Sequence, residues 1–290
     1  MTPLKADLLL LALAAVWGSG YSVTKAAIAV IPPIQFLTYR YMISLILSVF
    51  FFRKKLIKAE KSDWYAGTIA GTLLTVSMLI QTIGLQYTSA GKAVFIASAF
   101  VILVPPFFWI VSREKPKRKI MAAALLMMLG LGLLSVDPAG VNGINKGDLL
   151  VFLSAVTFAM HTVALGVFAP KRDPYLLSGI QFIVSGLLFL IISFFVPGGH
   201  PVSLEIIPPV LYSALIVTFV CTVTQVVCQK YTSPNRAAIM INLEAVFGSL
   251  IAVAFLGESY TPRMILAFGI TFAAVLIAEL NLSKSPTKKE

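Results

Sequence analysis

Charged residues are scarce in this chain of 290 residues, where only 12% are Asp, Glu, Lys or Arg and 58% are hydrophobic. Soluble domains usually carry about twice that share of charge, so the composition excludes an ordinary soluble globule. A helix of roughly 20 apolar residues crosses the hydrocarbon layer with its backbone hydrogen bonds made internally. The long apolar runs therefore predict an all-α integral membrane protein.

Cysteine and histidine are also rare, with two of each in the chain. Cys221 and Cys228 lie seven residues apart in one apolar run. That spacing is about 10 Å along a helix, beyond the roughly 7 Å Cα separation that a disulfide tolerates. No zinc or redox spacing is present, so we expect no metal and no cofactor.

The chain lacks the signatures of several function classes. No Gly-rich loop ending in Lys and Ser or Thr occurs, which argues against a nucleotide-driven pump. The net charge of +11 does not belong to a basic soluble domain, so no nucleic-acid partner is expected. An enzyme needs paired carboxylates, a histidine cluster or an activated nucleophile. We therefore do not expect an enzyme.

A repeated segment is the main feature that is present. Tyr87 to Glu114 returns as Tyr231 to Glu258 at a constant offset of 144 residues. The matching pairs are Tyr87 and Tyr231, Thr88 and Thr232, Ser89 and Ser233, Lys92 and Arg236, and Glu114 and Glu258. The sequence thus divides into two similar halves, 1–141 and 142–290.

Ten apolar runs are long enough to be membrane spans, five in each half. An odd number of spans makes the second half enter the membrane from the opposite side, which predicts two inverted five-helix repeats. The predicted spans are Asp7 to Val30, Pro33 to Phe52, Trp64 to Leu85, Ala93 to Val111, Ile120 to Val136, Leu149 to Phe168, Pro174 to Val196, Pro208 to Gln229, Ala237 to Leu256 and Met264 to Leu280.

Most of the 23 basic residues fall in alternate short loops. By the positive-inside rule these loops face the cytoplasm. We therefore expect a multi-pass protein of the cytoplasmic membrane with both termini cytoplasmic. Lys92 is then outside, whereas its repeat partner Arg236 is inside.

Several short motifs keep a recognisable order along the two halves. They are Trp17-Gly18-Ser19, Arg40, Pro105 followed by Glu114, Asn242-Leu243-Glu244, and Gly257-Glu258. Over nearly the whole chain this pattern resembles the EamA-type transporters of the drug/metabolite transporter superfamily. The resemblance implies ten helices around a central cavity, with export or exchange of small metabolites such as amino acids by alternating access.

The sequence departs from that family pattern in two places. Ala245 stands where the family commonly has Pro, so the usual cause of a kink in the ninth span is missing. Arg113 stands where a Gly commonly precedes the Glu of the first half. The departures leave the predicted fold unchanged.

Glu244 is the one acidic residue well inside a predicted span. Buried ionisable groups are costly in a membrane, so Glu244 is a candidate for coupling or gating, for example by carrying a proton. The alternative is that it holds the two halves together. Arg40 is its natural basic partner, although roughly 8 Å of depth separates the two, and anchoring is the alternative for Arg40.

Polar and aromatic side chains suggest a substrate-binding cavity. Trp17 and Tyr21 share one face of the first span, and Thr157 and His161 share one face of the sixth. The eighth span carries a polar stripe that includes Thr222 and Gln225. The repeat pairs Gln81 with Gln225 and Ser98 with Asn242. Packing between helices is the alternative for all of these residues.

These features predict a secondary transporter for small metabolites, such as amino acids or related amphipathic and aromatic compounds, moved outward by alternating access. A lipid flippase is the alternative, followed by an intramembrane lipid-modifying enzyme. The expected partners are a small-molecule substrate and membrane lipids. Substrate identity, direction, proton coupling and oligomeric state stay open.

Overall fold

A computed structural model describes residues 1–113, 115–116, 118–135, 145–196, 203–257 and 261–279. Glu114, Glu258 and the predicted boundary between 141 and 142 lie outside these residues. Within the described part the chain is built of helices joined by short connections. The prediction of an all-α protein is therefore confirmed for the part of the chain that is described.

Eight helical segments are long and apolar enough to cross a membrane, which makes this a multi-pass membrane protein. They are α1 (Pro3–Ile28), α2 (Pro33–Leu56), α3 (Lys61–Leu85), α4 (Ala90–Ala97) with α5 (Phe100–Ser112), α7 (Lys146–Phe168) with η1 (Ala169–Lys171), α8 (Pro174–Phe195), η2 (Leu204–Ile206) with α9 (Ile207–Leu211), η3 (Tyr212–Val220) and α10 (Cys221–Gln229), and α11 (Pro234–Asn242) with α12 (Glu244–Leu256).

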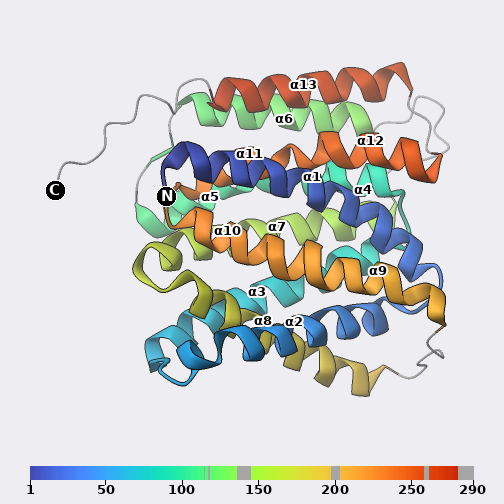
Figure 1. The fold of residues 1–290 in the computed structure, drawn as a ribbon. Coiled ribbons are helices and arrows are strands. Elements are labelled where there is room, and N and C mark those ends of the chain that lie inside the picture. The colour runs from blue at the N-terminus through green and yellow to red at the C-terminus, as the bar shows by residue number, and fades with distance from the viewer. Residues whose placement is uncertain (114, 117, 136–144, 197–202, 258–260, 280–290) are drawn as a thin grey trace.

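Two further helices occupy the places of the fifth and tenth predicted spans. They are α6 (Arg118–Ser135) and α13 (Pro262–Glu279). The two pack against each other along one edge of the bundle, outside α4, α5 and α12 (Figure 1). A total of ten spans stays a prediction.

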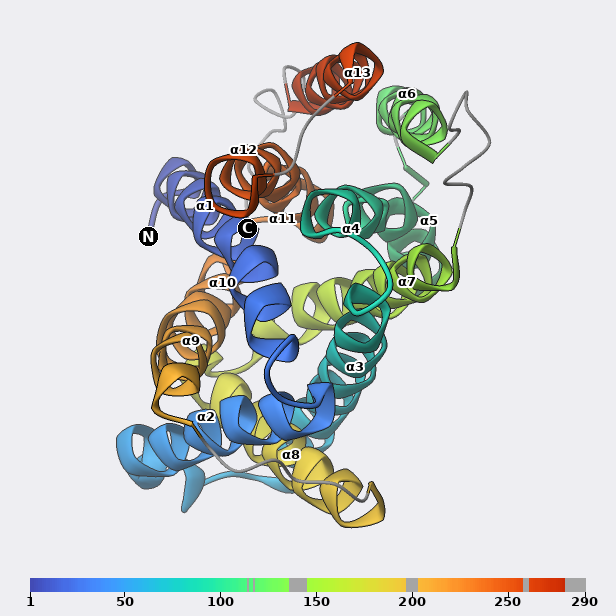
Figure 2. The ribbon, with the colours of Figure 1, turned by 90° about the vertical axis from the view of Figure 1, so that its right-hand side faces the viewer.

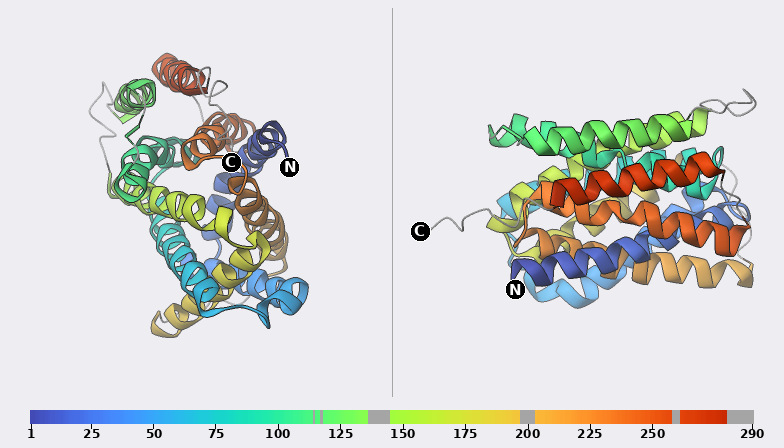
Figure 3. Two further views of the ribbon diagram at one scale, coloured as in Figure 1. Left: turned by 90° about the vertical axis from the view of Figure 1, so that its left-hand side faces the viewer. Right: turned by 90° about the horizontal axis from the view of Figure 1, so that it is seen from above.

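The long helices run side by side along one direction (Figures 1 and 3). Figure 2 looks along them and shows α1, α3, α7 and α10 around the middle of the bundle, with α2 and α8 at one side. α1 and α11 begin at one end, whereas α4 and α7 begin at the other (Figure 1). We call these the N-terminal end and the opposite end.

The fourth and ninth spans are each interrupted near mid-length. α4 ends at Ala97 and α5 begins at Phe100, while α11 and α12 meet at Leu243. The chain tightens at both breaks, with Ala99 N donating to Ile96 O at 3.0 Å and Leu243 N donating to Met240 O at 3.4 Å. The ninth span thus breaks without the family's proline, at the place that the offset of 144 matches to the break in the fourth.

The same two spans end in a left-handed residue. Arg113 closes α5 with φ 61°, and Gly257 closes α12 with φ 64°. Glycine adopts this conformation freely, whereas a residue with a Cβ atom is strained there by about 1 kcal/mol or more. Arg113 therefore keeps the cap geometry of the second half at a conformational cost.

Candidate functional site

A cavity lies in the middle of the bundle, and its lining residues come from α1, α2, α3, α4, α7, η3, α10 and α12. It encloses roughly 750 Å³ of space, counting the part open to solvent. Seven of the predicted site residues line it, from five helices of both halves. They are Trp17, Tyr21, Arg40, Gln81, Thr222, Gln225 and Glu244.

Four predicted site residues are not among those lining this cavity. Ser98 and Thr157 donate their hydroxyl hydrogens to carbonyls of their own span, at 2.6 Å to Phe95 O and 2.9 Å to Ser154 O. Asn242 is buried at the end of α11. His161 is treated separately because its partner comes from another helix.

His161 is fully buried between α7 and α8. Its Nε2 lies 3.1 Å from Oε1 of Gln181, and its ring packs 5.8 Å from the ring of Phe158. A histidine with these two contacts fixes how its helix packs against the neighbouring helix. The alternative interpretation of His161, as a packing residue, is the one that these contacts support.

Glu244 is the first residue of α12, and its side chain reaches the cavity although it is only 5% exposed. The break at Leu243 creates a new helix start at this point, and helix starts favour negative charge. A neighbouring contact fixes the backbone. A Cβ on Gly18 would lie 2.8 Å from Glu244 O and 2.6 Å from Gly248 N, so α1 touches α12 backbone to backbone.

Arg40 enters the cavity from α2 and is 7% exposed. Its Nε donates to the hydroxyl of Thr218, and its guanidinium lies 5.7 Å from the centre of the Tyr41 ring. Among the residues that the structure describes, the ion pairs do not join Arg40 to Glu244. The cavity thus presents a basic and an acidic group that are not paired with each other.

Thr218 belongs to the π-helical segment η3, which the sequence did not predict. Such widened turns are rare and often occur at functional sites. Here the segment also accepts a hydrogen bond from Trp17, whose Nε1 lies 2.8 Å from Val217 O. The indole therefore lies in the cavity wall and is held there by the eighth span, and its part in substrate binding stays a prediction.

The repeat partners Gln81 and Gln225 differ in their contacts. Gln81 Nε2 donates to the hydroxyl of Tyr21 at 2.9 Å. Gln225 is 1% exposed, and neither its amide nitrogen nor its amide oxygen has a hydrogen-bond partner among the described residues. A buried amide in that condition costs about 1–3 kcal/mol. Its position in the cavity wall points to a polar ligand.

Phe158 is the cavity residue that sequence reasoning missed most clearly. Its ring meets Trp17 at 6.2 Å and Phe100 at 5.2 Å, both edge to face. Such pairs add about 0.5–1.5 kcal/mol each beyond the area that they bury. Phe158 is the residue after Thr157 in the sixth span and lies outside the predicted stripe of Thr157 and His161, and its aromatic character was the available signal.

The described residues contain no group of three or more His, Cys, Asp or Glu side chains that could hold a metal ion. Both cysteines are buried thiols. The polar chemistry of the cavity is that of a guanidinium, a carboxyl group, two amides and hydroxyls. This set can bind a small polar molecule and exchange a proton with it.

Comparisons with known proteins agree with this picture. The sequence model of the EamA-like transporter family matches residues 4–136 and 145–280. An "Uncharacterized transporter" of Archaeoglobus fulgidus is 29% identical over 279 residues, which cover 96% of this chain and 87% of that protein. The "Uncharacterized transporter YwfM" of Bacillus subtilis is 24% identical over 288 residues, covering 94% and 92%.

A solved structure titled "Crystal structure of protein" has the same fold. It superposes with a TM-score of 0.75 at 17% sequence identity, covering 97% of this chain and 99% of that chain. At this identity the likeness concerns the fold alone. Neither relative's name gives a substrate.

Proposed function

Because this chain belongs to the EamA-like transporter family, we propose that it is a secondary transporter of small amphipathic metabolites that works by alternating access. Membership of the family makes it a membrane transporter. The substrate class, the direction and the mechanism are our proposals. We assign the direction as export from the cytoplasm, with both termini on the cytoplasmic side because most basic loop residues lie there.

The proposed architecture is ten spans in two inverted repeats, 1–141 and 142–290. Three observations support it: the family model matches two separate segments, the helix breaks recur at the offset of 144, and α4 and α11 begin at opposite ends of the bundle (Figure 1). Inverted repeats are common in secondary transporters, where the site lies near the midplane.

One observation carries the substrate class: the cavity contains Arg40 and Glu244 without an ion pair between them. A zwitterion complements such a cavity. Its carboxylate would bind the guanidinium of Arg40, and its ammonium group would bind Glu244. The ring of Trp17 would cover the apolar part of the ligand. Amino acids and related aromatic compounds have this chemistry.

Glu244 is also the group that we assign to proton coupling. It is a carboxyl group in the cavity, so a bound ammonium group and a proton would compete for it. Such competition makes the two binding events mutually exclusive, which is the requirement for exchange of one against the other. The alternative role of Glu244, joining the halves, predicts no such competition.

The function is tested with purified protein in liposomes. Uptake of labelled aromatic and aliphatic amino acids is measured with and without a pH gradient, and protein-free liposomes are the control. We expect saturable uptake that the gradient accelerates. Movement of fluorescent lipid without movement of any amino acid would instead favour a flippase, and uptake equal to that of the empty liposomes would contradict a transporter of this class.

A further inference from the structure

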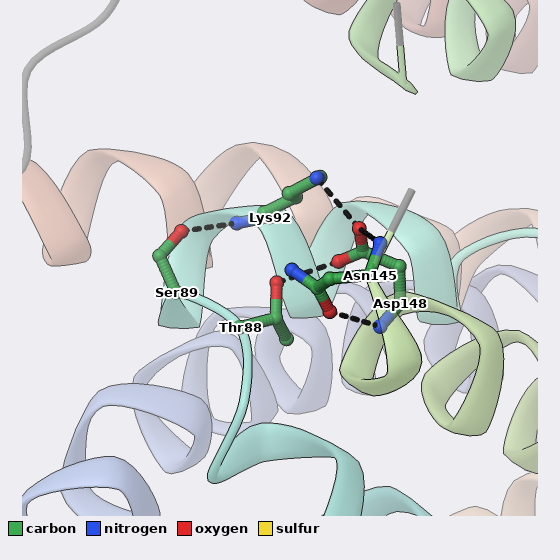
Figure 4. A network of polar contacts seen from close by, with 5 residues as sticks. All are labelled: Thr88, Ser89, Lys92, Asn145 and Asp148. Carbon is green, nitrogen blue, oxygen red and sulfur yellow. Dashed lines mark hydrogen bonds and ion pairs between the residues drawn. The ribbon is translucent and has the colours of Figure 1, made fainter. Parts of the chain in front are cut away.

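Two ion pairs lie at matching places at opposite ends of the bundle. At the opposite end, Lys92 Nζ of α4 is 2.6 Å from Asp148 Oδ2 of α7 (Figure 4). At the N-terminal end, Arg236 Nη2 of α11 is 2.7 Å from Asp7 Oδ2 of α1. Lys92 and Arg236 are related by the offset of 144, and each aspartate lies near the start of its helix.

Both pairs are built from the same local structure. Ser89 caps α4 by accepting from Lys92 N at 3.2 Å, and Ser233 caps α11 by accepting from Arg236 N at 3.3 Å. Each basic residue therefore sits in the first turn of a short half-helix. The cap fixes where the side chain starts, so the pair joins that half-helix to one particular neighbour.

The aspartates are the more deeply buried partners, with side chains 4% exposed for Asp148 and 6% for Asp7. Asp148 also accepts from the hydroxyl of Thr88 at 2.7 Å and from the backbone of Asn145 at 3.0 Å (Figure 4). Separating a buried carboxylate from its basic partner leaves an uncompensated charge, which is strongly unfavourable. Each ion pair therefore has two distinct arrangements: it is formed, or it is broken and both charged groups are exposed to water.

The half-helices end at the cavity. α4 stops at Ala97, which lines the cavity, and α11 stops just before Glu244, which also lines it. Helix breaks are points where a chain can bend. Each half-helix is held by an ion pair at its outer end and is interrupted at its inner end. It can therefore move as a rigid unit when the ion pair breaks.

We propose that Lys92–Asp148 and Arg236–Asp7 are the two latches of the transport cycle. Each latch closes the cavity toward its own end of the bundle, and each step of the cycle opens one while the other stays formed. This inference rests on the proposed alternating-access function. Both latches are formed in this structure.

A third ion pair provides a matched control. Lys55 of α2 and Asp173 at the start of α8 form an exposed pair, with side chains 45% and 40% exposed. Burial alone would raise the pKa of Asp173, but the hydrogen bonds from Lys55 and the Leu176 N–H outweigh it and lower the pKa. This pair holds two unbroken helices at the N-terminal end, so its loss should not open the cavity.

The test is accessibility of the cavity from each side of the membrane. Cys221 and Cys228 are replaced by Ala, and Thr24→Cys or Thr222→Cys places a reporter in the cavity wall. A membrane-impermeant maleimide is applied to right-side-out and to inverted vesicles. Labelling is compared for the wild-type pairs, Lys92→Gln, Arg236→Gln and the control Lys55→Gln.

Opposite shifts are the expected result. Lys92→Gln should raise labelling from the side of Lys92 on the order of tenfold, a typical strength for coupling between two states, and lower it from the other side. Arg236→Gln should do the reverse, and Lys55→Gln should change neither. Equal changes from both sides, or no change, would overturn the proposal.

The charge-conserving variant Lys92→Arg, which keeps Asp148 and its hydrogen bonds from Thr88 and Asn145, supplies a second readout if Lys92→Gln fails to insert. Labelling near the wild-type value is expected, whereas free access from one side would contradict a latch. Labelling needs no substrate, so the two proposals can fail separately. Opposite shifts in labelling without amino-acid uptake would contradict only the substrate proposal. Amino-acid uptake without shifts in labelling would contradict only the latch proposal.

Discussion

The joint between α1 and α12 and the joint between α7 and α5 occupy matching places in the two halves but are built differently. In the first, Gly18 and Gly248 bring the two backbones into contact beside Glu244. In the second, Phe158 and Phe100 fill the space with rings 5.2 Å apart. Phe158 aligns with Gly18 at an offset of 140, and Phe100 aligns with Glu244 at 144.

This difference shows how a duplicated fold acquires one polar site. The close approach at the first joint leaves no room for side chains between the helices, so the carboxyl group of Glu244 is directed to the cavity. At the second joint the rings exclude water and contribute an apolar wall through Phe158. One half therefore supplies the charge and the other supplies the surface for the apolar part of a ligand.

The largest effect is expected from closing the space at the first joint. Gly18→Leu would place atoms within 2.6 Å of the α12 backbone, which cannot move away as a side chain could. We expect a loss of several kcal/mol, above the roughly 1–3 kcal/mol of ordinary overpacking, seen as loss of the monodisperse protein in detergent. Gly269→Leu on α13 is the control, because nothing lies within 4 Å of its Cβ position. Equal stability of both variants would contradict the contact.

Removing the charge at the first joint should separate coupling from folding. Glu244→Gln keeps the shape of the side chain but cannot exchange a proton, so the stimulation of uptake by a pH gradient should disappear, a loss on the order of tenfold for a typical coupling. Thermal stability in detergent should stay close to that of the wild type. Phe100→Leu, the matching change at the second joint, should leave the pH dependence intact. An unfolded Glu244→Gln protein would favour the structural role.

The two repeat-related amides should differ in their effect on binding. Gln225 has no partner among the described residues, so Gln225→Leu should weaken substrate binding by about ten- to a hundredfold, since a hydrogen bond to a charged group contributes about 1.5–3 kcal/mol. Gln81 already binds Tyr21, so Gln81→Leu should act mainly on stability. Calorimetric titration and thermal unfolding of both variants distinguish these effects. A reversed order would contradict the assignment of Gln225 to the ligand.

The smallest effect concerns the two left-handed caps. Arg113→Gly should relieve the strain at φ 61° and raise the free energy of unfolding by up to about 1 kcal/mol, because left-handed strain slightly exceeds the entropy cost of glycine. Gly257→Arg should lower it by a similar amount. The melting temperatures of both variants report the difference. A fall for Arg113→Gly would show that the arginine side chain makes a stabilising contact.

Much of this architecture could be predicted from the sequence. Apolar runs mark helices in a membrane because the backbone has no other partners there, and the repeat marks the two helix starts at Ser89 and Ser233. Seven predicted residues line the cavity. They could be predicted because they are polar or aromatic residues placed well inside apolar helices.

The features of the site that could not be predicted depend on contacts between segments that are distant in the sequence. Gln81 and Gln225 are equivalent in sequence, yet only Tyr21 on α1 satisfies the first. His161 turns away because Gln181, on another helix, binds its ring. The π-helical turn that holds Arg40 and Trp17 has no local sequence signal that we recognise. The hydrogen-bond partners of these side chains are determined by how the helices pack, and hydropathy carries no information about that packing.

If the cavity binds both charges of a zwitterion, its affinity should depend on both, and a comparison of three ligands tests this most directly. Binding of phenylalanine, phenethylamine and N-acetylphenylalanine to the purified protein is measured by calorimetric titration. We predict that phenylalanine binds at least about tenfold more tightly than either analogue, because each analogue leaves Arg40 or Glu244 without its partner. Equal binding of all three ligands would contradict the claim.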